Sequence, residues 1–261
     1  MKALQIAASG MSAQQMRVDV VSNNLANMST TAYNARRAEF ADLHYQQFVR
    51  PGAVTAADGT LMPTGIQLGL GVRSTAVSII LSQGSLRETG GDLDLAIEGA
   101  GWLEVNLPSG LPAYTRDGSL KRTAEGVIVT SEGYEVTPAL TIPTDARNLS
   151  VNTDGEIWVY FSDRIEPEMI GQLSLVTFSN EKGLEAIGSN LFIETEASGA
   201  PLLSAPGENG LGRFRQGFLE ESSVDSVREV TELIKAQRGY ELNAKVITAA
   251  DQMLSTTTQV R

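Results

Sequence analysis

The 261-residue chain contains no cysteine and a single histidine, His44. Without cysteine there is no disulfide, no thiol nucleophile and no Cys-ligated zinc site. One histidine also excludes a His-based metal cluster and a pair of catalytic histidines. We interpret His44, which stands beside Tyr45, as a packing or surface residue.

Basic charge and long apolar runs are scarce as well. The formal net charge is −11, and such a surface repels nucleic acid and anionic lipid. No stretch approaches the roughly 18 uncharged apolar residues of a membrane helix. The apolar run after Lys2 is broken by polar residues and has no clear cleavage site, so we expect no cleaved signal peptide.

Catalytic signatures are missing too. No nucleophile elbow, Walker loop, His-Glu-x-x-His or Gly-x-Gly-x-x-Gly occurs in the sequence. Asp92 and Asp94 share one strand face at period two, and two like charges can form an acid/base pair. A solvated strand edge is the interpretation we favour. We therefore predict no enzyme, no cofactor and no metal, and keep an acidic soluble hydrolase as the alternative from another class.

Both ends of the chain carry apolar residues at a spacing of seven, with steps of three and four between two rows. This spacing is typical of helices that supercoil around partner helices. Polar residues interrupt the rows, so neither helix has an apolar face wide enough to fold well alone. We predict that the two ends pair and pack against further copies through these residues: Leu4, Met11, Val18, Val21, Leu25, Val230, Leu233, Gln237, Tyr240, Ala244, Ile247 and Leu254.

The middle of the chain predicts β structure. Residues 72–81 are rich in β-branched residues, and residues 93–97 and 103–107 alternate at period two. Four dipeptides of Asp or Glu with Gly, ending at Gly118, Gly126, Gly133 and Gly155, lie between short apolar runs and predict hairpins. Residues 50–71 have turn signals and no period, which indicates a long loop or an extended arm.

The second long helix is expected to begin at Ser222-Ser223-Val224-Asp225, which has the form of a capping box. The predicted fold class is therefore α+β, with a discontinuous coiled-coil domain from both chain ends, an extended arm and an inserted all-β module. We assign residues 1–45 with 217–261 to the terminal domain, 46–95 to the arm and connecting β segment, and 96–216 to the β domain.

Three stretches resemble one known family. Residues 9–15 with 21–27 resemble the N-terminal signature of the flagellar rod and hook proteins, and residues 232–241 resemble the matching C-terminal signature. Residues 94–99 with 114–118 resemble the family's central module. Ala32 departs from the pattern, since the family usually has glycine there, and this puts the local turn geometry in question.

Within the family, the chain length and the stretch from Tyr45 to Gly71 look most like the members that build the distal rod. The resemblance implies a helical homopolymer, a rigid drive shaft in the periplasm between the motor and the hook. It implies export by the flagellar type III apparatus, and as partners the proximal rod proteins, the hook protein and the ring proteins of peptidoglycan and outer membrane. A proximal rod or hook subunit is the close alternative.

We expect the arm to bridge neighbouring subunits and stiffen the rod. The residues assigned to this role are Arg50, Pro51, Asp58, Pro63 and Gly65.

Overall fold

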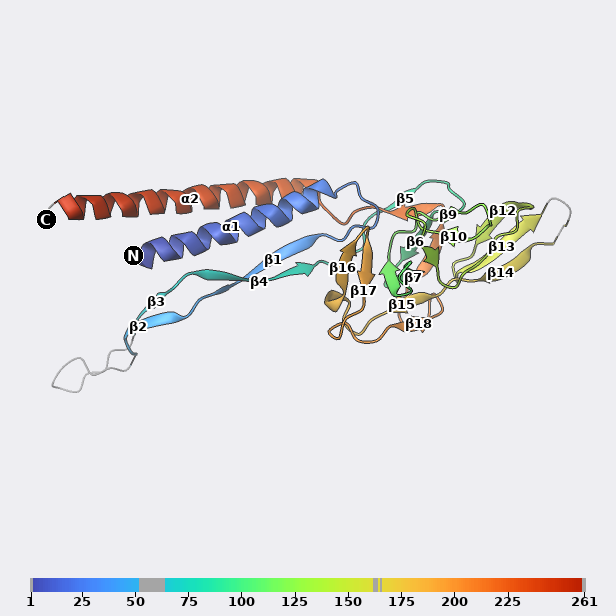
Figure 1. The fold of residues 1–261 in the computed structure, drawn as a ribbon, viewed down its shortest axis with the longest axis horizontal. Coiled ribbons are helices and arrows are strands. Elements are labelled where there is room, and N and C mark those ends of the chain that lie inside the picture. Colours follow the sequence, from blue (N-terminus) through green and yellow to red (C-terminus); the bar gives the residue numbers. More distant parts are fainter. Residues whose placement is uncertain (1, 52–63, 162–163, 165, 260–261) are drawn as a thin grey trace. The chain divides into compact units, whose positions relative to one another are not determined.

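The computed structural model describes residues 2–51, 64–161, 164 and 166–259. It is a mixed α+β structure, which confirms the predicted class (Figure 1). The chain divides into two compact units. Unit 1 consists of residues 1–26, 36–80 and 225–261, and unit 2 of residues 27–35 and 81–224. The three-part division proposed from the sequence stays a prediction.

Unit 1 contains two long helices and two antiparallel ribbons. Helices α1 and α2 lie side by side and run in opposite directions (Figure 1). Strand β1 pairs with β4 and β2 with β3, and α1 also packs on the β1–β4 ribbon. The elements are α1 (Lys2–Ala26), β1 (Arg36–Asp42), β2 (Tyr45–Val49), β3 (Ile66–Gly69), β4 (Val72–Ile79) and α2 (Ser226–Gln259).

The two helices begin and end close to where the sequence indicates. Helix α1 ends at Ala26, as the Asn-rich stretch predicts. Helix α2 begins at Ser226, later than the capping box suggested. Its cap is Asp225, whose Oδ1 accepts hydrogen bonds from the backbone N–H groups of Val227 and Arg228 at 3.0 and 3.2 Å. A carboxylate cap satisfies two free donors and suits the positive end of the helix dipole.

Unit 2 is built from short strands. Its main sheet has seven strands in the order β16-β17-β8-β7-β11-β10-β9, beside the three-stranded sheet β12-β13-β14 and the pairs β15-β18, β19-β6 and β20-β5. The elements are β5 (Leu86–Glu88), β6 (Leu95–Glu98), β7 (Leu103–Asn106), β8 (Pro112–Thr115), β9 (Lys121–Arg122), β10 (Ile128–Val129), β11 (Glu135–Val136), β12 (Ala146–Val151), β13 (Glu156–Phe161), β14 (Glu168–Gln172), β15 (Leu175–Thr177), the 3₁₀ turn η1 (Glu181–Gly183), β16 (Glu185–Gly188), β17 (Leu191–Ile193), β18 (Leu202–Ser204), β19 (Arg213–Gln216) and β20 (Phe218–Glu220).

Three of the four predicted hairpins form. Gly126, Gly133 and Gly155 have φ of 91°, 94° and 80°, and they turn the chain between β9 and β10, β10 and β11, and β12 and β13. Such φ values favour glycine. The fourth prediction is wrong. Gly118 accepts a hydrogen bond from the backbone N–H of Leu95 at 3.0 Å, so this stretch crosses to a distant strand.

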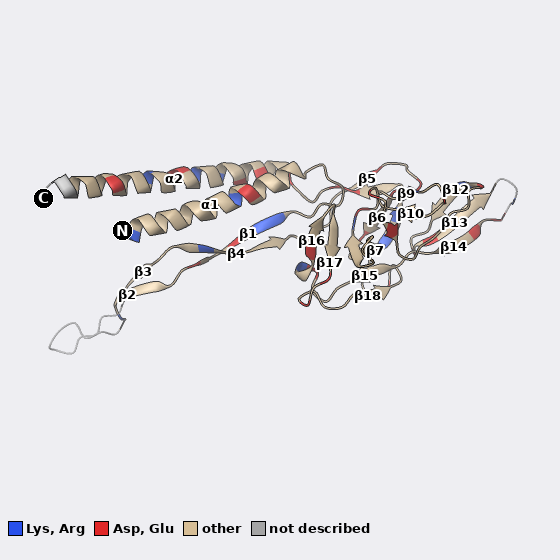
Figure 2. Cartoon of the chain, viewed as in Figure 1, with Lys and Arg blue, Asp and Glu red and all other residues tan. Residues whose placement is uncertain are grey.

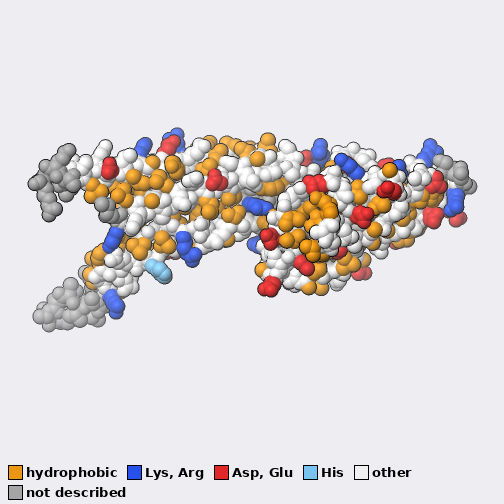
Figure 3. Space-filling model, viewed as in Figure 1, with side chains coloured by type: hydrophobic (Ala, Val, Ile, Leu, Met, Phe, Trp, Pro, Cys, Tyr) orange, Lys and Arg blue, Asp and Glu red, His pale blue; other side chains and the backbone are white. Residues whose placement is uncertain are grey.

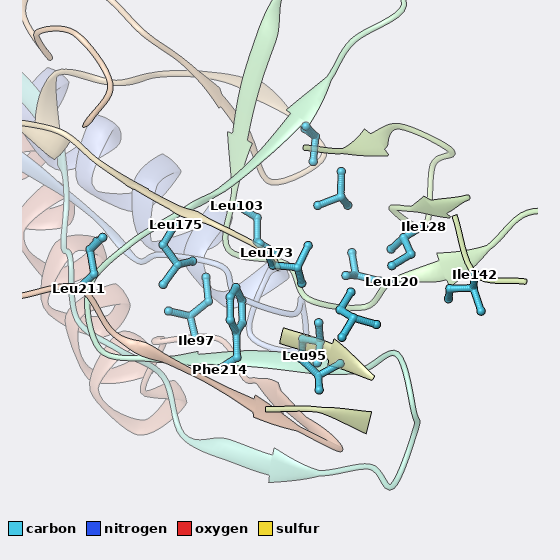
Figure 4. Packing of buried hydrophobic residues seen from close by; sticks show 14 of the residues in the cluster. Leu95, Ile97, Leu103, Leu120, Ile128, Ile142, Leu173, Leu175, Leu211 and Phe214 are labelled. Atoms are coloured by element: carbon cyan, nitrogen blue, oxygen red, sulfur yellow. The ribbon is translucent and has the colours of Figure 1, made fainter. Parts of the chain in front are cut away.

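The core of unit 2 is a continuous apolar cluster. Leu95, Ile97, Leu103, Leu175 and Phe214 are almost fully buried and come from four different strands (Figure 4). Inward and outward side chains alternate along β13, where Ile157 and Val159 face the core. This alternation is the period-two pattern of the sequence, and it gives unit 2 a core of its own.

A buried ion pair ties distant parts of unit 2 together. The Arg116 guanidinium donates to the Glu220 carboxylate at 2.9 and 3.0 Å and to the backbone carbonyls of Gly101 and Gly99 at 2.9 and 3.0 Å. The Glu220 carbonyl also accepts from the backbone N–H of Ala32 at 2.8 Å. Ala32 has φ of 54°, the left-handed conformation in which glycine is normally favoured.

We expect Arg116→Met to lower the free energy of unfolding of unit 2 by about 3 to 5 kcal/mol, because it leaves the buried Glu220 carboxylate without its counter-charge. Both tryptophans, Trp102 and Trp158, lie in unit 2, so their fluorescence during urea unfolding reports this loss. The matched control is Arg164→Met, whose partner Glu168 is exposed and whose effect should be below about 0.5 kcal/mol. Equal effects would refute the assigned role of the buried pair.

Candidate functional site

The paired helices meet through two reciprocal contacts. Gly10 of α1 faces the Asn243 amide of α2, and Gly239 of α2 faces the Gln14 amide of α1. A Cβ atom at Gly10 would lie 2.9 Å from Asn243 Nδ2, and one at Gly239 would lie 3.0 Å from Gln14 Cδ. Each amide therefore occupies the space that a side chain on the facing helix would need. The two contacts fix one antiparallel register.

A third polar contact continues the same register at the other end of the helix pair. The buried Asn24 side chain donates to Glu229 Oε2 of α2 at 3.1 Å and to the backbone carbonyl of Arg36 at 2.8 Å. Its Oδ1 accepts from the Arg36 N–H at 2.9 Å. One buried amide thus joins α1, α2 and the start of β1. A buried polar group that is satisfied in only one alignment specifies register.

The inner face of α2 is formed by small and polar residues. Ala236 is fully buried and Ala250 nearly so, and with Glu229 and Asn243 they form a row at a spacing of seven. Alanine and glycine along a helix interface allow the two backbones to approach closely. On α2, neither apolar row of the sequence prediction coincides with this row, whereas on α1 the predicted Val21 is buried.

The predicted assembly residues occupy several different environments. Val21 is buried in unit 1. Six others are half-buried: Leu4, Met11, Val18, Leu25, Leu233 and Ile247. Ala244 is half-buried as well, whereas Val230, Gln237, Tyr240 and Leu254 are exposed. The structure of one copy does not bury these residues as a set, and their role in assembly stays a prediction.

Helix α2 leaves large apolar side chains in solvent. Val227, Val230 and Ile234, at a spacing of three and four, stand on the side opposite Ala236, and Val227 and Ile234 are 76% and 52% exposed. Leu242, Val246 and Met253 are also exposed, on a different side of the helix nearer its end. Apolar side chains are visible over the helix pair in the space-filling view (Figure 3). An extended apolar surface of this kind is typical of an interaction site.

The residues of the helix interface were missed because they are small or polar. Gly10, Asn24, Gly239 and Asn243 carry little or no hydrophobic signal, so a search for large apolar residues passes over them. The available signal was the pair Ala236 and Ala250, two heptads apart, together with the two glycines that weaken otherwise regular helices. Gly10 and Gly239 each lie inside a long helix and mark the points where α1 and α2 approach closely.

The ribbon that leads to the arm is also partly apolar at its surface. Tyr45, Phe48, Ile66 and Leu68 of β2 and β3 are exposed. Arg50 and Pro51 are exposed and Gly65 is half-buried; a Cβ atom at Gly65 would lie 2.4 Å from the Val49 carbonyl oxygen. Asp58 and Pro63, assigned to the arm from the sequence, lie outside the described residues.

Asp92 and Asp94, the acid/base pair considered from the sequence, lie in different environments. Asp94 accepts a hydrogen bond from the Thr89 hydroxyl at 2.5 Å, and Asp92 is exposed. On α2, the Lys235 ammonium donates to Glu232 at 2.8 Å and holds the pKa of that carboxyl below its usual value. The described residues contain no group of acidic or histidine side chains arranged to hold a metal ion. Neither described helix is long and apolar enough to cross a membrane.

One small cavity in unit 2 contains a perturbed carboxyl group. Its volume is about 190 Å³, and Trp102, Arg116 and Glu181 are among its lining residues. Burial raises the pKa of Glu181, although the nearby Arg116 charge and the Trp102 indole act in the opposite direction. The Arg116 donors are already engaged by Glu220 and backbone carbonyls. The cavity therefore lies beside a structural ion pair.

Three family models match the chain. Residues 4–33 match "Flagella basal body rod protein", residues 96–159 match "Flagellar hook protein FlgE/F/G D1 domain", and residues 215–260 match "Flagellar basal body rod FlgEFG protein C-terminal". The first and third matches cover most of α1 and α2, the helices whose contacts form the candidate site.

Curated relatives align over the full length. The flagellar basal-body rod protein FlgG of Caulobacter vibrioides is 50% identical over 100% of both chains. FlgG of Agrobacterium fabrum is 45% identical over 98% of this chain and 97% of its own. The flagellar hook-basal body complex protein FlhP of Bacillus subtilis is 31% identical over 100% of both chains.

A solved structure, the flagellar hook protein FlgE2 of Helicobacter pylori, aligns with a TM-score of 0.25 at 15% identity, over 71% of this chain and 43% of that one. This similarity is too low to support an argument about the fold. The curated relatives are named as parts of the flagellum and not as enzymes, so the expectation of a structural, non-enzymatic protein is confirmed. The chain belongs to the flagellar basal-body rod protein family.

Proposed function

We propose that the chain is the subunit of a helical homopolymer that forms the rigid distal rod of a bacterial flagellum. Family membership supports a structural subunit of the rod and a place in the basal body. The observation that supports polymerisation is the exposed apolar surface of α2, which includes Val227, Val230 and Ile234. Burying one such side chain against another copy stabilises the contact by about 1.5 to 3 kcal/mol.

We infer that unit 1 is the assembly domain and contains the discontinuous coiled coil predicted from the sequence. Two helices that already pair through small residues present their large apolar residues outward, where a second copy packs against them. Contacts that do not close on themselves generate a filament. Unit 2, with a core of its own, is then the inserted β module.

The remaining partners follow from this place in the flagellum. The subunit meets proximal rod proteins at one end of the distal rod and the hook protein at the other, and it turns within the ring proteins of peptidoglycan and outer membrane. Export through the flagellar type III apparatus, without a cleaved signal peptide, delivers it to the periplasm. The absence of cysteine suits this route, because an exported unfolded chain cannot then cross-link.

The segment from Arg50 to Gly71 is the rod-stiffening arm in this proposal. Its described base, the β2–β3 ribbon, exposes Tyr45, Phe48 and Ile66, which suits docking on a neighbouring copy. The arm also separates the distal rod from the alternative of a proximal rod or hook subunit. In those proteins its removal should leave assembly and stiffness unchanged.

The first test is Ile234→Asn, which removes an exposed apolar side chain from the outer face of α2. We expect the critical concentration for polymerisation to rise at least about 10-fold, the equivalent of about 1.4 kcal/mol per contact. Sedimentation of polymer from a dilution series measures it. Leu111→Asn, at an exposed leucine of unit 2, is the matched control and should leave the critical concentration unchanged. If both variants polymerise like the parent protein, assembly does not use this face.

The second test removes the arm without disturbing its base. Residues 50–65 are replaced by Asn-Gly, which closes a two-residue hairpin across the Val49–Ile66 pair. We expect polymers that form but bend more easily, with a persistence length reduced at least about 2-fold. The reason is that removing the arm removes contacts between neighbouring copies, and these contacts resist bending of the rod. Contour tracing in electron micrographs measures it. An unchanged persistence length would favour the proximal rod or hook alternative.

A further inference from the structure

The two antiparallel ribbons of unit 1 meet at a short joint. Strand β1 continues into β2 through Leu43 and His44, and β3 continues into β4 through Leu70 and Gly71. Two backbone hydrogen bonds cross the joint. The Leu43 N–H donates to the Gly71 carbonyl at 2.8 Å, and the Leu70 N–H donates to the carbonyl of His44 at 3.3 Å. The strands therefore stay paired, while the regular ladder is interrupted at the base of the arm.

Helix α1 contacts this joint through the hydroxyl group of Ser9. The hydroxyl donates to the Ile6 carbonyl at 2.8 Å, which restrains the side chain, and its oxygen accepts from the Val72 N–H at 3.3 Å. Gly71 has φ of 121°, and a Cβ atom there would overlap Ser9 Oγ. The glycine thus leaves the space that the Ser9 hydroxyl occupies.

A second contact joins the start of α1 to the β2–β3 ribbon. The Lys2 ammonium group donates to the side-chain oxygen of Gln46 and lies 5.0 Å from the centre of the Phe48 ring. A cation at the face of an aromatic ring is attracted by the ring quadrupole. Neither β2 nor β3 contains a charged residue (Figure 2). The contact therefore uses an amide and an aromatic ring instead of an ion pair.

Two separate points of attachment define a direction. Helix α1 packs on β1 and β4, so the β1–β4 ribbon is held by the helix. The β2–β3 ribbon lies beyond the joint, near the start of α1 (Figure 1), and attachment at a single point would allow it to swing. Lys2 and Ser9 are two helical turns apart, about 10 Å along the axis, and project from the same side of α1.

We propose that Ser9 and Lys2 are positioning residues, which fix the direction in which the β2–β3 ribbon at the base of the arm leaves helix α1. Ser9 sets the joint, and Lys2 limits the swing of the ribbon. The use of this direction to reach a neighbouring copy rests on the proposed function. The direction itself is a property of one copy.

The test measures distances within one copy by double electron–electron resonance. Because the chain has no cysteine, spin labels attach only at introduced cysteines. Gln15→Cys on α1 with Gln67→Cys on β3 reports the direction of the ribbon, and Gln15→Cys with Thr75→Cys on β4 reports helix packing. All three positions are exposed. Labelled chains are diluted in unlabelled protein, so that pairs of labels on different copies do not contribute.

We expect Ser9→Ala and Lys2→Met each to broaden the distance distribution between labels 15 and 67 at least about 2-fold, because each removes one restraint on the ribbon. The distribution between labels 15 and 75 should stay unchanged, since α1 still packs on β4. Lys2→Arg retains the positive charge and the hydrogen-bond donors, and should restore the narrow distribution.

The matched control is Ser12→Ala, the same substitution at an exposed position of α1, which should leave both distributions unchanged. Serine to alanine favours a helix, so a role of Ser9 in the helix alone predicts no broadening.

The positioning role is refuted if the distribution between labels 15 and 67 stays narrow when Ser9→Ala and Lys2→Met are combined, or if Lys2→Arg broadens it as much as Lys2→Met. Equal broadening between labels 15 and 75 also refutes it, because the two residues then support helix packing in general. These distances do not depend on polymer formation. The proposed function is judged separately, by the critical concentration of Ile234→Asn.

Discussion

The close antiparallel contact between α1 and α2 is the constraint on which the rest of unit 1 depends. Gly10 and Gly239 each leave room for an amide from the facing helix, and Ala236 allows the backbones to approach between them. Only one alignment places both amides opposite both glycines. The small inner face has a consequence, because Val227, Val230 and Ile234 of α2 then remain exposed. The packing that joins the two chain ends therefore leaves apolar surface of α2 exposed.

The two units reach stability by different means. Unit 2 buries a continuous apolar cluster and reinforces it with the Arg116–Glu220 pair, which is the arrangement of a self-sufficient domain. Unit 1 consists of long helices and narrow ribbons with little interior, and much of its apolar surface is still exposed. A protein made for polymerisation benefits from this contrast.

Charge follows the same division. The nearly neutral unit carries the apolar helix face, and almost all uncompensated negative charge lies in the unit with its own core. Buried charge is used structurally, because Arg116 satisfies Glu220 and several backbone carbonyls at once. The half-buried Glu181 and its raised pKa arise beside that pair and need no catalytic explanation.

The secondary structure of this protein could largely be predicted from the sequence, because residues close together in the chain determine it. The long helices, the α+β class, the strand positions and three hairpin turns follow from periodicity and from glycines that adopt positive φ. The family signatures lie in contiguous stretches and were recognisable for the same reason. Tertiary structure decided which helix face is buried, since the partner of Gly10 is Asn243, more than 200 residues away. It also decided that Gly118 meets β6 instead of closing a hairpin, and that Glu220 binds Arg116. In each case the deciding contact joins residues distant in the sequence, and backbone groups or small or polar side chains make it, so hydrophobic periodicity gave no signal of it.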